Sequence, residues 1–75
     1  MYTIYSKPNC SYCLQAKQLL EMEQLPFEYK NLGTHYSLDE LMTLSPDAKS
    51  FPQVFKDGVL IGGFSDLAEY LKQEY

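Results

Sequence analysis

Two cysteines separated by two residues are the side chains best suited to chemistry in this sequence. Cys10 and Cys13 are its only cysteines, and Ser11 and Tyr12 lie between them. A cysteine thiolate attacks disulfides, and a second thiol within reach completes the exchange. The pair therefore points first to thiol–disulfide chemistry.

The cysteine pair lies where an extended segment is expected to turn into a helix. Thr3–Tyr5 is typical of a strand, residues 7–9 of a turn, and Leu14–Glu23 of a helix. A helix start favours negative charge but contributes only ~0.3–1 kcal/mol to the stability of a thiolate. Lowering the pKa of a cysteine from ~8.5 to ~5, so that it is almost fully ionised at about pH 7, requires about 5 kcal/mol. Lys7 is the expected additional cation, and N–H···S hydrogen bonds are a further source of stabilisation.

Two other uses of a cysteine pair are less well supported. A disulfide across so short a loop constrains the unfolded chain by only about 2 kcal/mol and joins no distant segments. A closed zinc site needs four ligands, but the chain has no second cysteine pair and His35 is its only histidine. A C-x-x-C motif in a βαβ context is a recognised redox signature, so the redox interpretation is favoured.

Length and charge narrow the function classes. The 75 residues predict one domain covering 1–75. A net charge of −4 argues against nucleic acid as a partner. No apolar stretch approaches the ~20 residues that cross a membrane. The first residues are strand-like and leave no room for a signal peptide, so we expect a reducing cytoplasm, where a cysteine pair is reactive rather than structural.

The first half of the chain predicts a βαβ unit followed by a short helix. Residues 2–5 form a buried strand, and the first helix turns Cys13, Ala16, Leu19 and Leu20 toward the core. Leu25-Pro26 closes this helix, and Phe27–Leu32 is a second strand parallel to the first. Ser37 and Glu40 match a capping box for a short helix that is expected to turn Leu38, Leu41 and Met42 inward.

The second half predicts a hairpin and a last helix. Phe51–Phe55 is a third strand, Lys56-Asp57-Gly58 is a hairpin turn, and Val59–Ile61 is the returning strand. Ser65 is expected to cap the last helix, which turns Leu67, Tyr70 and Leu71 inward. The order βαβ, α, ββα predicts an α/β fold, with a four-stranded mixed sheet flanked by three helices. The first strand should be central and carry Cys10 at its carboxyl end.

Three segments in this order make the whole chain resemble a glutaredoxin, of the thioredoxin-fold superfamily. Cys10-Ser11-Tyr12-Cys13 is similar to the Cys-Pro-Tyr-Cys of the family, so the chain resembles a small dithiol member with a Cys-Ser-Tyr-Cys site. Ser50-Phe51-Pro52 is similar to Thr-Val-Pro, and Gly62-Gly63-Phe64-Ser65-Asp66 to a nearly identical family segment.

The resemblance implies a glutathione-dependent thiol–disulfide oxidoreductase that serves electron transport and cell redox homeostasis. Cys10 would attack a mixed disulfide between a protein and glutathione, or a protein disulfide directly. Cys13 would resolve the intermediate, and glutathione would act as the reductant. The implied partners are glutathione and disulfide-containing proteins, with the chain itself a monomer.

The resemblance also implies where glutathione binds. Pro52 would be cis, and the backbone of Phe51 would pair with the cysteinyl part of the tripeptide. Asp66 would contact its α-amino group, and N–H groups near Phe64 and Ser65 would hold the adjacent carboxylate. The implied glutathione-binding residues are Lys7, Tyr12, Phe51, Pro52, Gly63, Phe64, Ser65 and Asp66, with Lys7 facing the glycine carboxylate.

Three departures from the family pattern affect these expectations. Ser11 replaces the usual proline, and in some members that serine accompanies a glutathione-dependent [2Fe–2S] cluster shared by two subunits, so cluster binding through Cys10 stays open. Phe51 replaces valine. The polar side chain that commonly helps to hold the glycine carboxylate is missing, and Thr34 and His35 are weak candidates for that role.

The residues also leave a second redox function open. Small redoxins reduced by thioredoxin reductase, which serve ribonucleotide reductase, are of similar size. Asp66 and the Gly62-Gly63 segment favour glutathione over that alternative.

Overall fold

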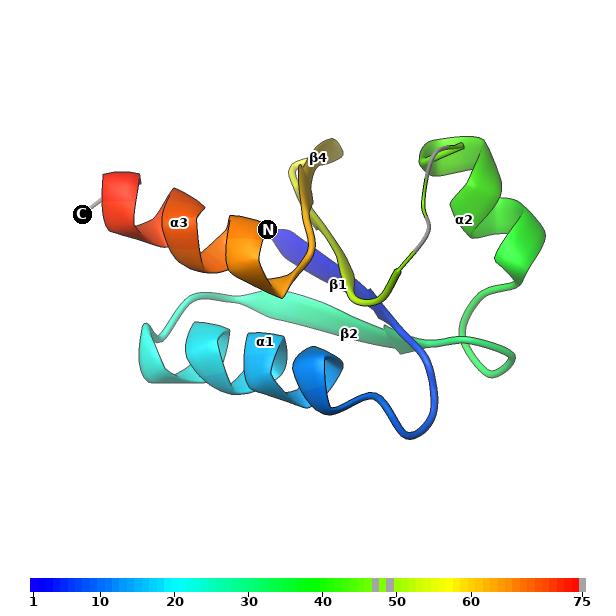
Figure 1. Cartoon of the computed structure of the whole chain (residues 1–75), viewed down its shortest axis with the longest axis horizontal. Helices are drawn as coiled ribbons and strands as arrows, with labels where there is room; N and C mark the ends of the chain where they lie inside the picture. The colour runs from blue at the N-terminus through cyan, green and yellow to red at the C-terminus, as the bar shows by residue number, and fades with distance from the viewer. Residues whose placement is uncertain (47, 49, 75) are drawn as a thin grey trace.

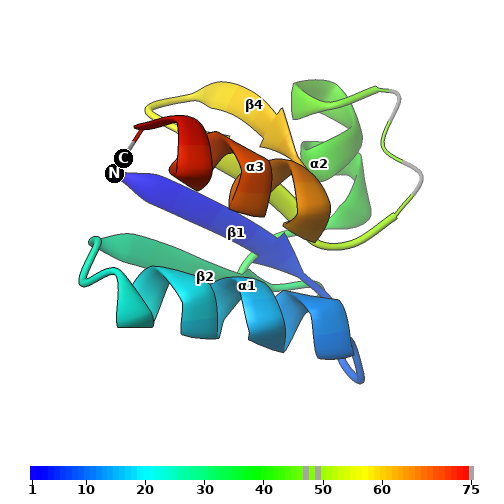
Figure 2. The same ribbon diagram turned by 60° about the vertical axis from the view of Figure 1, so that its left-hand side comes forward.

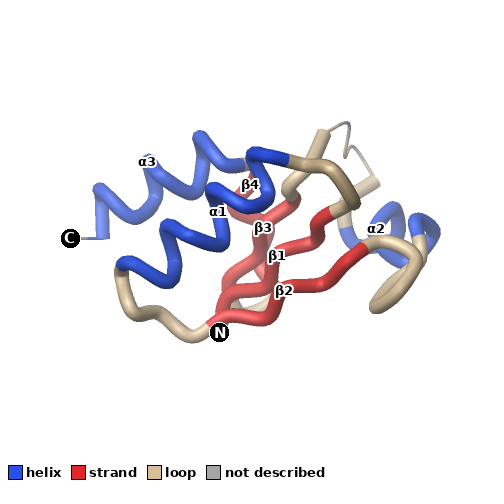
Figure 3. Tube along the Cα trace, turned by 90° about the horizontal axis from the view of Figure 1, so that it is seen from below, coloured by secondary structure: helices blue, strands red, loops and turns tan. Residues whose placement is uncertain are grey.

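The computed structural model describes residues 1–46, 48 and 50–74, and its architecture is a four-stranded mixed sheet with helices on both faces (Figure 1). The elements in chain order are β1 (Tyr2–Ser6), α1 (Ser11–Met22), β2 (Phe27–Asn31), α2 (Leu38–Leu44), β3 (Gln53–Lys56), β4 (Val59–Gly62) and α3 (Phe64–Glu74). Helices α1 and α3 lie side by side over one face of the sheet, and α2 lies apart from them (Figure 3). The expected α/β architecture is confirmed.

The sheet has the strand order β2-β1-β3-β4. Strand β1 pairs in parallel with β2, so that Ile4 lies opposite Tyr29, and antiparallel with β3, so that Ile4 also lies opposite Val54. The βαβ unit and the central place of the first strand are thereby confirmed. Strand β1 runs from the N-terminus toward the loop that enters α1 (Figure 2). Every residue of that loop therefore emerges from the middle of the sheet.

The main core lies between the sheet and the pair α1 and α3. Because alternate strand residues point to opposite faces, Tyr2 and Ile4 share the face that these helices cover. The buried members of this core are Tyr2, Ile4, Ala16, Leu20, Val54, Leu67 and Leu71. Tyr70 is only half-buried at its edge. This packing fixes the position of α1 relative to β1, and hence that of the cysteine pair.

The opposite face of the sheet carries a smaller aromatic cluster. The rings of Tyr36 and Phe55 meet that of Tyr5 nearly edge-on, with centroids 4.9 and 5.4 Å away. Leu41 of α2 joins this cluster and is buried. Edge-to-face contacts between aromatic rings favour this arrangement beyond the area that they bury.

Helix α2 corrects the expectation that three of its apolar residues point inward. Leu41 is 1% exposed, but Leu38 is 51% and Met42 37% exposed. A helix of seven residues makes only about two turns, and this one rests on the aromatic cluster through one residue. The capping box of Ser37 and Glu40 at its start is confirmed.

Helix α3 begins two residues earlier than the sequence predicts, since a cap at Ser65 would make Asp66 its first residue. Its first residue is Phe64, so Ser65 lies inside the helix and is not its cap. The carboxylate of Asp66 accepts a hydrogen bond from the N–H of Gly63 at 3.1 Å, which satisfies a donor that the helix itself leaves unpaired. Asp66 therefore organises the start of this helix in place of Ser65.

The β3–β4 turn and the N-terminus meet at the end of the sheet away from the cysteines. Asp57 and Gly58 have φ values of 51° and 83°, as the tight hairpin expected here requires. The N-terminal ammonium of Met1 donates to the Asp57 carboxylate. This hydrogen bond and the charge of the ammonium lower the pKa of Asp57. Among the described residues, no helix is long and apolar enough to cross a membrane.

Candidate active site around Cys10 and Cys13

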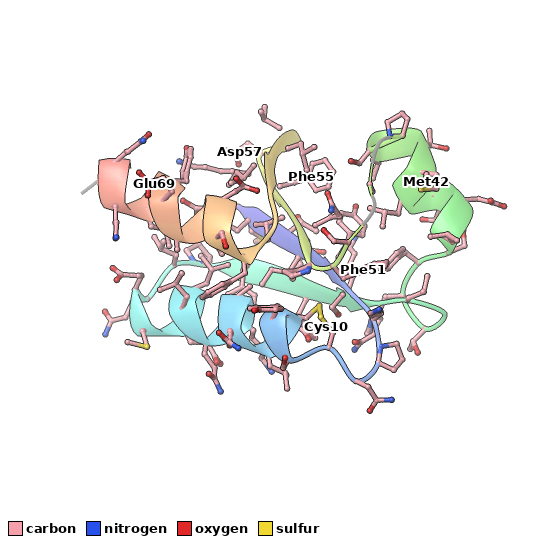
Figure 4. All side chains as sticks on the ribbon, viewed as in Figure 1. Cys10, Met42, Phe51, Phe55, Asp57 and Glu69 are labelled. Atoms are coloured by element: carbon pink, nitrogen blue, oxygen red, sulfur yellow. A yellow bond between two sulfur atoms is a disulfide. The ribbon has the colours of Figure 1, made fainter. Side chains whose placement is uncertain are left out.

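The two cysteines lie at the junction of β1 and α1. Cys10 is the N-cap of α1 and lies at the start of that helix (Figure 4). Its Sγ accepts a hydrogen bond from the N–H of Cys13 at 3.1 Å. Cys10 is partly exposed, whereas Cys13 is 0% exposed and faces the core. The two residues form a disulfide, and their Cα atoms are 5.3 Å apart. The expected N–H···S hydrogen bond and the inward direction of Cys13 are both confirmed.

A buried polar network anchors the strand end that leads to Cys10. Ser6 is 0% exposed, and its hydroxyl donates to the carbonyl of Lys30 at 2.9 Å. The carbonyl of Ser6 accepts from the N–H of Leu32 at 2.9 Å and from the hydroxyl of Tyr36 at 2.7 Å. Burial, together with the neighbouring Tyr5, raises the pKa of Tyr36 to about 12. The hydroxyl therefore stays a hydrogen-bond donor throughout the neutral range.

A cavity of about 300 Å³ lies between the Pro52 turn and the start of α3, and Tyr12 of the cysteine motif also lines it. We call it the proline groove; its walls are Tyr12, Ser50, Phe51, Pro52, Gly63, Phe64, Ser65 and Asp66. The structure thus brings together seven of the eight residues for which the resemblance implied a shared site. The peptide bond between Phe51 and Pro52 is cis, as that resemblance also implied.

Gly62 permits the close approach of the Asp66 carboxylate at the end of this groove. Its φ is 131°, and a Cβ atom placed on it would lie 2.7 Å from Cγ of Asp66. The space that a Cβ atom on residue 62 would take is therefore occupied by the side chain of Asp66, the residue that organises the start of α3. A Cβ on Gly63 would instead meet the carbonyl oxygen of Pro52 at an ordinary 3.6 Å.

Lys7 is the predicted site residue that does not line the proline groove. It borders a second cavity of about 640 Å³, which we call the strand cavity; its walls are Lys7, Pro8, Asn9, Cys10, Ser11, Leu14, Tyr29 and Asn31. The Nζ atom of Lys7 also lies 5.5 Å from the centre of the Phe51 ring. Lys7 thus approaches the proline groove at Phe51.

Neither weak candidate for holding a glycine carboxylate lines these cavities. Thr34 and His35 lie in the turn after β2, and Nδ1 of His35 accepts a hydrogen bond from the N–H of Asn31 at 3.0 Å. Several wall residues of the two cavities are not among the predicted site residues, and Ser50 and Tyr29 are two of them. The sequence indicates Ser50 only as part of the Ser50-Phe51-Pro52 motif and Tyr29 only as a strand residue. Tyr29 comes close to Cys10 through the parallel pairing of β1 and β2.

The donor atoms of one chain do not fit an iron–sulfur cluster by themselves. The described residues contain no group of three or more His, Cys, Asp or Glu side chains that could share an ion. Cys13 is fully buried, which leaves Cys10 as the one accessible thiolate donor. Any cluster would need ligands from outside this chain.

A glutaredoxin family model matches residues 2–61 of this sequence. The chain belongs to the glutaredoxin family. It is therefore a thiol–disulfide oxidoreductase with Cys10 and Cys13 as its redox-active pair.

Curated relatives agree with this assignment. A glutaredoxin of Enterobacteria phage T4 is 40% identical over 87 residues, which cover 96% of this chain and 100% of the relative. The hybrid peroxiredoxin hyPrx5 of Haemophilus influenzae is 40% identical over 68 residues. That match covers 91% of this chain but only 28% of the peroxiredoxin, so this glutaredoxin spans less than a third of that longer relative.

Solved structures show the same fold. The reduced glutaredoxin of Escherichia coli superimposes with a TM-score of 0.82 at 25% identity, covering 96% of this chain and 93% of the other. A buckwheat glutaredoxin–glutathione complex gives a TM-score of 0.81 at 23% identity, over 97% of this chain and 69% of the other. The expected thioredoxin fold is confirmed.

Proposed function

We propose that this glutaredoxin uses glutathione as its reductant and reduces both protein disulfides and glutathione mixed disulfides. The observation that carries the proposal is the proline groove, which places a free strand-like backbone and a helix start beside Tyr12, the residue between Ser11 and Cys13 in the cysteine motif. The buckwheat glutaredoxin of the same fold, solved as a glutathione complex, supports it further.

The groups in the groove match those of the tripeptide. Among the described residues, the backbone of Phe51 has no hydrogen-bond partner and precedes β3, so it is free to pair with the cysteinyl residue. The first N–H groups of α3, at Phe64 and Ser65, suit the α-carboxylate of the γ-glutamyl residue. Asp66 uses Oδ2 for Gly63 and keeps Oδ1 for the α-ammonium group.

Reduction of the disulfide takes two glutathione molecules. A glutathione thiolate attacks Sγ of Cys10, the Cys10–Cys13 bond breaks, and Cys13 leaves as a thiolate that takes up a proton. A second glutathione thiolate attacks the glutathione sulfur of this mixed disulfide, releasing glutathione disulfide and the Cys10 thiolate. Two electrons have then passed from two thiols to the cysteine pair.

The reduced pair returns these electrons to a substrate. The Cys10 thiolate attacks one sulfur of a protein disulfide, and the other substrate sulfur leaves as a thiolate. Cys13 then attacks Sγ of Cys10, which releases the reduced substrate and re-forms the Cys10–Cys13 disulfide. When the substrate is a glutathione mixed disulfide, Cys10 takes the glutathione moiety and a second glutathione completes the cycle without Cys13.

Reduction of hydroxyethyl disulfide, coupled to glutathione, glutathione reductase and NADPH, tests the proposal. We expect turnover by the native chain and none by Cys10→Ser. Full turnover by Cys10→Ser would show that the nucleophile is assigned wrongly. Absence of turnover by the native chain would remove the glutathione assignment.

Two alternatives are separated by their electron donor or their cofactor. A redoxin serving ribonucleotide reductase would accept electrons from thioredoxin reductase faster than from glutathione, so rates with the two donors decide between them. A cluster-binding role rests on Ser11 at the first position of α1. Anaerobic incubation with iron, sulfide and glutathione should then give visible absorbance and a dimer, and neither would appear if the role is absent.

A further inference from the structure

We propose that the strand cavity binds an acidic segment of the disulfide-bearing protein substrate, on the side of its target cysteine that points away from the proline groove. The inference rests on the proposed exchange at Cys10 and names the chemistry of the protein partner.

The two cavities lie on opposite sides of the start of α1. Tyr12 lines the proline groove, whereas Leu14 lines the strand cavity. At 3.6 residues per turn, these two side chains point about 200° apart around the helix. Cys10 itself belongs to the wall of the strand cavity. A chain bonded to its sulfur can therefore extend in two directions, one into each cavity.

Length decides which ligand reaches the strand cavity. Glutathione has one residue on each side of its cysteine, and the proline groove offers about 300 Å³ for it. A protein continues beyond its cysteine, and an extended chain advances about 3.3–3.6 Å per residue. Two or three further residues would cover about 7–10 Å and enter the cavity of about 640 Å³.

The charges around the strand cavity select an acidic segment. Of the described residues that line it, Lys7 is charged and none is Asp or Glu. Lys17 adds a second cation at the rim, with Nζ 5.2 Å from the centre of the Tyr29 ring. Glu28, the neighbour of Tyr29 in β2, points to the other face of the sheet, where its carboxylate lies 3.9 Å from Nζ of Lys30.

This distribution contrasts with the rest of the chain. The sequence has ten acidic residues against six basic ones. The cavity between β4 and α3 has three acidic residues in its wall, Asp57, Asp66 and Glu69, against one basic residue, Lys56. A positive wall next to the reactive sulfur of a protein with a net charge of −4 favours approach of acidic segments and repels basic ones.

The wall also offers an apolar contact. Leu14 is 52% exposed although it lies next to the active site, and Tyr29 forms the opposite wall from β2. Burying an exposed leucine side chain against a partner stabilises binding through the hydrophobic effect. The segment that fits best therefore carries an acidic residue near Lys7 or Lys17 and an apolar residue against Leu14.

Matched disulfide peptides test the inference without glutathione. Each probe is a cyclic peptide with one intramolecular disulfide and a Glu-Leu or Lys-Leu pair beside one cysteine, placed before it in one set and after it in another. Chain reduced beforehand with dithiothreitol and freed of it is mixed with each peptide, and the second-order rate of peptide reduction is measured at low and at high salt.

Two variants of α1 with the same change in charge make the test specific. Leu14→Glu places a carboxylate in the strand cavity. Met22→Glu introduces the same charge outside that cavity, at an exposed apolar position about two turns further along the helix. Lys17→Gln is a second variant that removes a rim cation. Hydroxyethyl disulfide turnover with glutathione is measured for all of them.

We expect the native chain to reduce a Glu-Leu peptide about five- to tenfold faster than its Lys-Leu counterpart at low salt, with a smaller ratio at high salt. Leu14→Glu should bring the ratio close to one, Lys17→Gln should lower it, and Met22→Glu should preserve it. The inference would be overturned if the native chain reduced the Glu-Leu and Lys-Leu peptides at equal rates. It would also be overturned if the ratio of these two rates were the same in Leu14→Glu as in Met22→Glu. If the native chain did not turn over hydroxyethyl disulfide with glutathione, the glutathione assignment would be contradicted instead. The peptide assay contains no glutathione, so its result does not depend on that assignment.

Discussion

The backbone N–H of Cys13 points at Sγ of Cys10 from 3.1 Å away. The donor belongs to the first turn of α1, so it is fixed by the helix and needs no side chain to hold it. A hydrogen bond to a charged acceptor is worth more than one between neutral groups. The same contact therefore stabilises the Cys10 thiolate that each reaction cycle regenerates.

Replacement of Cys13 by serine should separate the two reactions of this glutaredoxin. Cys13→Ser keeps the backbone donor to Cys10 but removes the resolving thiol. We expect it to retain turnover of glutathione mixed disulfides and to lose turnover of protein disulfides. The steady-state rate with hydroxyethyl disulfide and glutathione measures turnover of glutathione mixed disulfides, and the rate with a disulfide-bonded protein measures turnover of protein disulfides. Cys10→Ser should be inactive in both assays. Full protein disulfide turnover by Cys13→Ser would contradict its role as the resolving thiol.

Neutralising Asp66 should weaken glutathione binding. Asp66→Asn keeps an oxygen that can accept from the N–H of Gly63 but removes the charge that would hold the α-ammonium group. Hydrogen bonds to charged groups contribute about 1.5–3 kcal/mol, so KM for glutathione should rise by about tenfold or more. Asp39→Asn, in the first turn of α2, is a control with the same change in net charge and should leave KM unchanged.

The stability of the fold should fall in alkali because of Tyr36. Its pKa of about 12 exceeds the ordinary value of 10.0, so the folded state favours the neutral hydroxyl. This contribution is fully present below about pH 10 and is lost as the pH rises toward about 12, a change of about 2–3 kcal/mol at 1.36 kcal/mol per pKa unit. Urea unfolding between pH 9 and pH 12 measures it.

Tyr36→Phe is the matched control for that titration. It lacks the ionisable hydroxyl and should lose less stability over the same pH range than the native chain. At neutral pH it should be less stable by about 1 kcal/mol, because the carbonyl of Ser6 loses a donor at 2.7 Å. Identical alkaline slopes in the two proteins would exclude Tyr36 as the cause.

Alanine at Gly62 should be more harmful than alanine at Gly58. Both glycines have positive φ, at 131° and 83°, but nothing lies within 4 Å of the Cβ position of Gly58. Gly58→Ala should therefore cost only the backbone term, about 1–2 kcal/mol. Gly62→Ala also collides with Asp66, so we expect a larger loss of thermal stability and a higher KM for glutathione. Equal effects of the two changes would mean that Asp66 moves aside freely.

The order of elements and the inward face of α1 could be predicted because each depends on local sequence. Cys13, Ala16 and Leu20 recur at helical spacing, and all three are buried. For α2 the same reasoning failed at Leu38 and Met42, because a helical pattern reports that one side is apolar and not how much of it meets the rest of the fold. That depends on where the helix rests on the sheet.

The candidate site could be predicted only where a motif lies in one segment. The walls of the proline groove come from three short segments that each carry a recognisable pattern. The strand cavity has no such pattern, since Tyr29 and Asn31 reach Cys10 only through the parallel register of β1 and β2. The start of α3 was misplaced because Ser65 and Asp66 both suit a helix start, and their hydrogen-bond geometry decides between them.

The position of the N-terminus bears on how this glutaredoxin can be attached to other molecules. Met1 lies beside Asp57, and the five residues of β1 separate it from the loop that leads to Cys10, a span of about 17 Å. A label, a solid support or a second domain joined there faces away from the reactive sulfur. Such a fusion would sacrifice one exposed ion pair and leave both cavities open to solvent.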